Sequence, residues 1–136
     1  MWSRWAASCR GTVSVAGRST RSLGSMRASS ALSEIQWHDA VLLRAIELAV
    51  EDALVFEVDY PEGALGELPN PHTIRFTDVT RYQIEEGPFS GAPTILSVAI
   101  LESRSEGRDT LRIETNAGHR IVECHAIELA RGRYAA

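Results

Sequence analysis

The chain has 136 residues, enough for one domain, and its 44% apolar and 24% charged content is ordinary for a globular protein. Its 14 basic residues are all arginines and are outnumbered by 18 acidic residues, which gives a formal net charge of −4. No apolar run approaches the roughly 20 residues that span a bilayer, so the sequence holds no candidate for a membrane-spanning helix.

Residues 1–33 differ from the rest of the chain in composition. They hold five arginines and nine serines but no acidic residue, whereas residues 34–136 hold nine arginines and all 18 acids, a net charge of −9. Three interpretations of this leader stay open: an organellar transit peptide, a basic arm that touches nucleic acid or anionic lipid, or a segment upstream of a true start at Met26. Each predicts a disordered leader, because it has too little apolar surface to offset the entropy of ordering. We therefore expect a single β-rich domain at 34–130 and a frayed tail at 131–136.

The first segment of the domain, 39–50, fits either a helix or a strand. Asp39 is a good residue to cap a helix, and the alanines, leucines and glutamate that follow are good helix formers. A strand also fits, since the even positions of the segment are apolar apart from Arg44. We predict a strand because the next segment, 53–60, alternates cleanly between apolar and polar residues.

Two loops rich in proline and glycine, 61–71 and 87–93, divide the middle of the chain. Between them, 73–84 predicts a strand with a bulge or break near Asp78, where the alternation changes phase. After them, 94–101 is apolar at nearly every position, which predicts a central strand covered on both faces.

The stretch 109–129 predicts a hairpin. Its first strand alternates, Asn116-Ala117-Gly118 forms a three-residue turn in which glycine supplies the left-handed backbone, and 119–129 is the return strand. Together these segments predict a mainly β fold. The expected architecture is an antiparallel sandwich or open barrel of about six or seven strands, with room for one short helix.

The group Trp37-His38-Asp39 is the most suggestive candidate site. A histidine oriented by a carboxylate can act as a general base or a metal ligand. The structural interpretation is favoured, in which Trp37 anchors the sheet and Asp39 accepts backbone amides, because adjacent residues of a strand point to opposite faces. The other candidate binding residues are His119 and Phe89, the latter as an exposed aromatic anchor in the second loop.

Cys124-His125 has the residue types of a nucleophile and its base, but neighbours in a strand diverge. Neither the four histidines nor the two cysteines show the spacing of a metal site, so we expect no metal and no cofactor. Cys9 lies in the leader and makes a poor disulfide partner for Cys124. This predicts a reduced, cytoplasmic protein.

The acidic charge of the domain bears on its partners. It repels nucleic acid and anionic membranes, and it suits a basic protein partner, whose encounter it would steer. A simpler interpretation is that the charge only keeps the domain soluble. The sequence leaves the oligomeric state open.

Four short motifs resemble a group of small uncharacterised bacterial proteins that begin with Trp-His-Asp-Ala. They are W-H-D-A-V-L-L at 37–43, V-F-E-V-D-Y-P at 55–61, I-R-F-T-D-V at 74–79 and R-I-E-T-N-A-G at 112–118. The resemblance covers 35–129 and implies a domain of several β-strands with a late hairpin. Some similar proteins look like immunity proteins, which neutralise a toxin by binding it.

Three functions are therefore expected, in this order. The first is a non-enzymatic domain that binds another protein in the immunity manner. The second is a small hydrolase or metal-dependent enzyme, which needs side chains among His38, Asp39, His119 and His125 to converge. The third is a β-barrel that binds a small molecule in an apolar cavity.

Overall fold

The computed structural model describes residues 25–60, 70–103 and 107–134. These residues form nine strands, one α-helix and one short 3-10 helix. In chain order the elements are β1 (Ser25–Arg27), α2 (Ala28–Glu34), β2 (Val41–Leu48), η3 (Ala49–Glu51), β3 (Ala53–Tyr60), β4 (Asn70–Thr77), β5 (Arg81–Glu86), β6 (Ile95–Ser103), β7 (Asp109–Thr115), β8 (Gly118–Cys124) and β9 (Ala126–Arg131).

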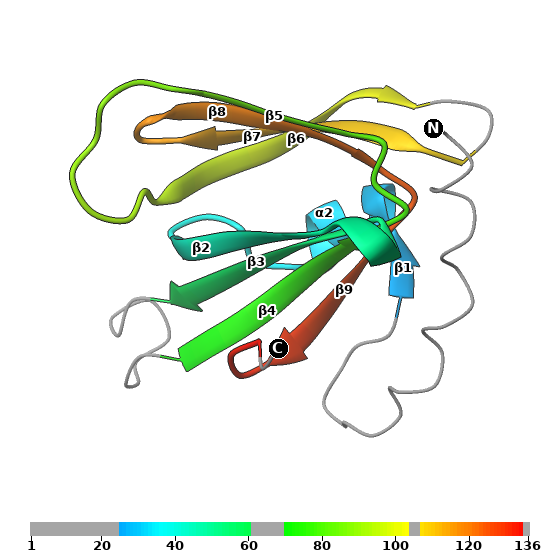
Figure 1. The fold of residues 1–136 in the computed structure, drawn as a ribbon, viewed down its shortest axis with the longest axis horizontal. Helices are drawn as coiled ribbons and strands as arrows, with labels where there is room; N and C mark the ends of the chain where they lie inside the picture. Colours follow the sequence, from blue (N-terminus) through cyan, green and yellow to red (C-terminus); the bar gives the residue numbers. More distant parts are fainter. Residues whose placement is uncertain (1–24, 61–69, 104–106, 135–136) are drawn as a thin grey trace.

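The strands form two antiparallel sheets that face each other (Figure 1). The first has five strands in the order β1-β9-β4-β3-β2, and the second has four strands in the order β5-β8-β7-β6. The sheets do not close into a barrel, so the prediction of a mainly β antiparallel sandwich is confirmed. More strands are present than expected, because 73–84 and 119–129 each divide between two strands and β1 comes from the leader.

Two segments cross from one sheet to the other at a shared corner. β4 continues into β5 past Asp78, whose φ of 58° lies in the left-handed region. β8 continues into β9 past His125, whose backbone N–H donates to the carbonyl of Thr77 at 3.0 Å and so joins the two crossings. The predicted break near Asp78 is confirmed. The prediction of a single return strand at 119–129 is wrong, because the strand-like composition continues across His125 and does not reveal where the chain leaves one sheet for the other.

The hairpin between β7 and β8 is tighter than expected. Thr115 pairs with Gly118, which leaves a turn of two residues, Asn116 and Ala117, instead of three. Gly118 has a φ of 150°, and a Cβ atom there would lie 2.2 Å from the carbonyl oxygen of Glu85 on the adjacent β5. Glycine is thus required by the close approach of β5 to β8 as well as by the backbone conformation.

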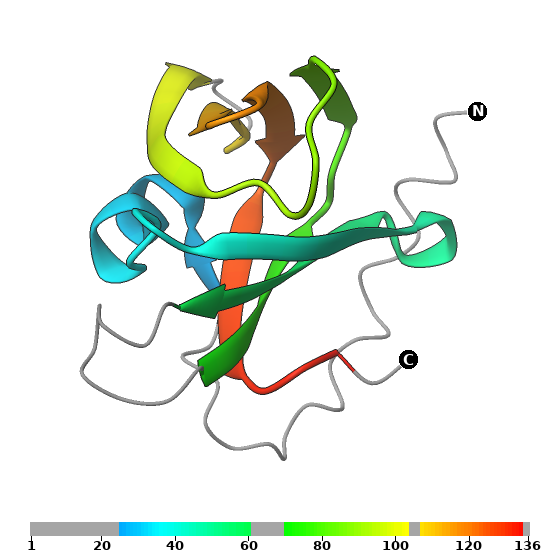
Figure 2. The ribbon, with the colours of Figure 1, turned by 90° about the vertical axis from the view of Figure 1, so that its left-hand side faces the viewer.

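Residues 25–33, expected to be disordered, are part of the fold. β1 pairs with β9, and α2 packs against β6, β7 and β9, below β6 in Figure 2. Ala28 and Ala31 are completely buried, since small side chains three residues apart let one face of the helix approach the core closely. Composition does not predict this order because it arises from these tertiary contacts. Residues 1–24 lie outside the described part of the chain, so the three interpretations of the leader stay predictions.

The start of the predicted tail is also fixed to the fold, so the expectation of fraying is wrong for residues 131–134. Arg131 belongs to β9. The N–H of Gly132 donates to the carbonyl of Pro71 at 2.8 Å, and the N–H of Tyr134 donates to the Glu57 carboxylate at 2.9 Å. These bonds were not predictable from local composition because both acceptors lie in distant strands.

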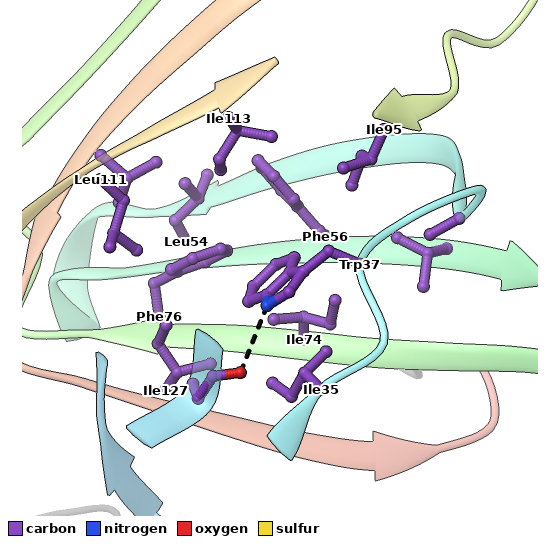
Figure 3. Packing of buried hydrophobic residues seen from close by; sticks show 14 of the residues in the cluster. Ile35, Trp37, Leu54, Phe56, Ile74, Phe76, Ile95, Leu111, Ile113 and Ile127 are labelled. Atoms are coloured by element: carbon purple, nitrogen blue, oxygen red, sulfur yellow. Dashed lines mark hydrogen bonds between the residues drawn. The ribbon is translucent and has the colours of Figure 1, made fainter. Parts of the chain in front are cut away.

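The core lies between the two sheets (Figure 3). Phe56 and Phe76 pack edge to face, with ring centroids 5.0 Å apart. Trp37 is buried beside Phe76, and its indole nitrogen donates to the carbonyl of Ala31 at 3.2 Å, the dashed line in Figure 3. Trp37 therefore fastens α2 to the core. The strand prediction for 39–50 is confirmed over Val41–Leu48, after which η3 makes the turn into β3.

Candidate functional site: the free edge of β6

The two edges of the four-stranded sheet differ in chemistry. β5 forms one edge and carries Arg81, Gln83, Glu85 and Glu86, which is the charged character that proteins commonly give to exposed edges. β6 forms the other edge, has nine residues and carries no charge before Glu102. An apolar edge strand offers unpaired backbone N–H and C=O groups to another chain.

β6 was expected to be a central strand, and that prediction is wrong. Val98 and Ile100 are half-buried against the core, but Leu96 is 43% exposed and Leu101 is 54% exposed. Both leucines lie where the register between β6 and β7 shifts, as bulged residues do. A continuous apolar run fits a strand covered on both faces, and it fits equally a bulged edge strand with apolar residues left in solvent.

The first part of the β6 edge is already occupied by the segment that leads into β2. Val41 forms an isolated antiparallel bridge with Thr94. The N–H of Asp39 donates to the carbonyl of Ile95 at 2.9 Å, and the N–H of Ile95 donates to the carbonyl of Ala40 at 2.8 Å. Among the described residues no strand pairs with Ser97–Ser103 on the side away from β7. We call that side of Ser97–Ser103 the free edge.

His38 and Asp39 lie at the start of the free edge. The Nδ1 atom of His38 lies 2.9 Å from the carbonyl oxygen of Leu96 and donates to it, since a carbonyl can only accept. The Nε2 atom lies 3.4 Å from Asp39 Oδ1. The expectation that these neighbours point apart is wrong, because they lie in a turn rather than a strand, with a φ of 74° at Asp39. Their side chains meet there, and His38 caps the last edge carbonyl before Ser97.

Acidic side chains flank the free edge at both ends. Glu102 is exposed near its far end. At the near end, Glu114 of β7 pairs in register with Ser97, and Asp39 is half-exposed beside His38. The one basic side chain beside β6 in this sheet is Arg112, which forms an ion pair with Glu114 among the described residues. The free edge is thus apolar at its centre and acidic at its ends.

Phe89, predicted as an aromatic anchor, is 45% exposed in the loop that leads from β5 into β6 (Figure 1). This placement is compatible with the predicted role. Of the predicted binding residues, His38, Asp39 and Phe89 therefore lie on segments that adjoin β6 or lead into it, whereas Trp37 is buried in the core.

The remaining predicted residues do not join His38. His119 lies on β8 opposite Glu114, and its Nδ1 atom lies 3.4 Å from the guanidinium of Arg112. His125 lies at the other end of β8, about 20 Å away at the usual rise of a strand, and contacts the carbonyl of Gly107 at 3.0 Å. Within the described ranges no group of three or more His, Cys, Asp or Glu residues could hold a metal ion.

Cys124 is a free, buried cysteine. Burial, together with the nearby Asp109 carboxylate, raises the pKa of its thiol to about 12. The thiolate is the reactive form of cysteine. This arrangement therefore does not make Cys124 a nucleophile with His125 as its base. Cys9 lies outside the described residues.

Sequence reasoning missed an ion pair that fastens β5 to β8. The Arg120 guanidinium donates to both oxygens of Glu86, at 2.7 and 2.8 Å, and to the hydroxyl of Tyr82 at 2.9 Å. The hydrogen bond from Arg120 lowers the pKa of Glu86, and the same bond raises the pKa of Arg120. Arg120 also lies 6.0 Å above the ring of Phe56. No local pattern reveals this cluster, because its members come from different strands.

The comparisons with known proteins do not identify the chain. No family model matches its sequence, and no curated protein matches it either. The resemblance to small bacterial proteins therefore stays a prediction. Within the part of the chain that the structure describes, no helix is both long and apolar enough to cross a membrane.

Proposed function

We propose that the protein is a non-enzymatic binding module that takes up an extended segment of a partner protein along the free edge of β6. The partner segment would add a fifth strand to the sheet β5-β8-β7-β6. The observation that supports this best is that the free edge is apolar and uncharged up to Glu102, whereas the opposite edge of the same sheet is charged.

Strand addition has two sources of affinity at this edge. Main-chain hydrogen bonds form with backbone groups of Ser97–Ser103 that no described strand occupies. The partner also covers Leu96 and Leu101, each about half-exposed, and burying the remaining surface of such a side chain contributes roughly 1 kcal/mol. Phe89, exposed in the loop between β5 and β6, is a further candidate for an aromatic contact.

This function agrees with the binding role that the resemblance to immunity proteins implies. A cytoplasmic location is part of the proposal, because a free buried Cys124 suits a reducing compartment. The enzyme alternative has less support, since His38, His119 and His125 make separate contacts in different parts of the fold. A ligand-binding barrel also has less support, since the two sheets stay open.

The test compares one substitution on each edge of the sheet. Leu101→Lys puts a charge on the free edge, and Ile84→Lys puts the same charge on β5 at a residue of similar exposure, 51% against 54%. The tagged full chain and both variants are used to capture proteins from an extract of the cells that make it. We expect a partner that is retained by Ile84→Lys and lost with Leu101→Lys. A partner captured equally by all three chains, or by none of them, would contradict strand addition at β6.

A further inference from the structure

We infer that the segment bound at the free edge is apolar at its centre and carries a lysine or arginine near each end, and that it belongs to a different protein rather than to a second copy of this chain. The inference rests on the proposed function and specifies the chemistry of the partner.

Acidic side chains lie at both ends of the free edge. Glu102 lies at one end, exposed and without an ion pair in the described structure. Asp39 and Glu114 lie at the other end. Glu114 forms an ion pair with Arg112, whereas the described contact of the Asp39 carboxylate is with the imidazole ring of His38. Among the described residues, an incoming strand therefore meets acidic side chains at both ends of the free edge and none between them.

The length of the segment follows from the boundaries of the free edge. The segment that leads into β2 forms hydrogen bonds with both the N–H and the carbonyl of Ile95, and the His38 ring donates to the carbonyl of Leu96. From Ser97 to Ser103 the edge extends about 20 Å, which matches a partner strand of about seven residues. Basic side chains at the two ends of such a strand are within reach of Glu102 and Asp39, in either strand direction.

A second copy of the chain fits this edge poorly. Two identical edges related by a two-fold axis pair antiparallel, so each copy would bring its own Glu102 to the Asp39 and Glu114 end of the other copy. β6 contains no basic residue with which to balance these acids. Counting the described side chains, self-pairing would thus place like charges together at both ends, which disfavours it.

The inference is tested with three fluorescein-labelled synthetic peptides. Each has a central segment of alternating valine and threonine, and the peptides differ only in having arginine, glutamine or glutamate at both ends. Binding to the full chain is measured by fluorescence anisotropy at low and high salt. The arginine peptide can form two or three exposed ion pairs with the acidic side chains at the ends of the free edge. We therefore expect it to bind about ten-fold more tightly than the glutamate peptide at low salt. This ratio should fall toward one in about 0.5 M salt, because salt screens exposed charges.

Two variants locate the effect. Glu102→Gln should weaken the arginine peptide about two- to three-fold and leave the glutamine peptide unchanged. Leu101→Gln should weaken all three peptides alike, whereas the matched Ile84→Gln on β5 should weaken none.

The possible outcomes separate the inference from the proposed function. If the three peptides bind equally and Leu101→Gln weakens them, the charge inference is wrong and strand addition stands. If no peptide binds and the chain sediments as a dimer that Leu101→Gln dissociates, the occupant is a second copy and the inference is wrong. If peptides bind but Leu101→Gln has no effect, or if no peptide binds a monomeric chain, the proposed function itself fails.

Discussion

The two edges of the four-stranded sheet, β5 beside β8 and β6 beside β7, differ in how their side chains protect the backbone against pairing. β5 carries charged and polar side chains, and Arg120 fastens it to β8 through Glu86. β6 keeps apolar side chains at its edge, two of them on bulges, and the β2 lead segment and His38 cover only its beginning. Charged side chains thus protect one edge of the sheet against pairing, whereas no strand in the described ranges occupies the backbone groups of Ser97–Ser103 on the other.

The largest expected effect on stability comes from disturbing the packing of β5 against β8. Gly118→Ala would place a Cβ atom 2.2 Å from the Glu85 carbonyl, so β5 and β8 must separate or shift. We expect a loss of about 2–4 kcal/mol in the free energy of unfolding, measured with urea. Gly91→Ala is the matched control in the loop before β6, where φ is also positive but no atom lies within 4 Å of the added Cβ. It should cost only about 1 kcal/mol, and equal losses in the two variants would contradict this account of Gly118.

The second effect concerns the ion pair on the protected side. Glu86→Gln should lower the free energy of unfolding by about 1–3 kcal/mol at neutral pH, because it removes the charge that Arg120 is paired with. Glu102→Gln, on the exposed end of β6, is the control and should leave the urea midpoint unchanged.

The same ion pair predicts a pH dependence. The folded-state pKa of Glu86 is lowered below its ordinary value of 4.5, so its stabilising contribution is present above that value and is lost as the pH falls through the folded-state pKa. The wild-type chain should therefore lose more stability than Glu86→Gln when the pH is lowered from about 4.5. Parallel stability curves for the two chains below pH 4.5 would contradict this assignment.

A smaller effect is expected where the covered part of β6 ends. His38→Ala removes the donor to the Leu96 carbonyl, and an exposed hydrogen bond of this kind contributes about 0.5–1 kcal/mol. The loss should appear as a small shift of the urea midpoint. His38→Asn, with a shorter side-chain donor, should recover part of it. A change above about 2 kcal/mol would mean that His38 supports more of the fold than the edge of β6.

The smallest effect on stability is expected at the free edge itself. Leu101→Lys alters an exposed, bulged residue, so the free energy of unfolding should change by less than about 0.5 kcal/mol, as for Ile84→Lys. If the two variants are equally stable but capture the partner differently, the two edges differ in binding and not in their contribution to stability. A large loss of stability with Leu101→Lys would instead make Leu101 a structural residue.

Regular alternation made much of the fold predictable. It identified β3 and the first strand of the late hairpin, and the change of phase near Asp78 identified one corner of the sandwich. The second corner, at His125, was not predictable because the apolar pattern continues across it. The order of β1 and α2 was not predictable either, because it depends on contacts such as that between Trp37 and the carbonyl of Ala31.

The candidate site was predictable only in part. His38 and Asp39 were chosen for their chemistry, and their location beside β6 follows from pairing between distant segments. The apolar run at 94–101 predicted a strand but not its place at an edge, since sequence does not order the strands of a sheet. The bulges that expose Leu96 and Leu101 depend on register with β7, which no single segment encodes.

Hydrogen exchange of the full chain, with and without the arginine-ended peptide, tests whether β6 is the strand that binds a partner segment. We predict that backbone amides of β6 within Ser97–Ser103 become protected when the peptide binds, while those of β5 do not change. Protection of β5 instead of β6, or no gain of protection in β6 at saturating peptide, would contradict the claim that β6 is the binding edge.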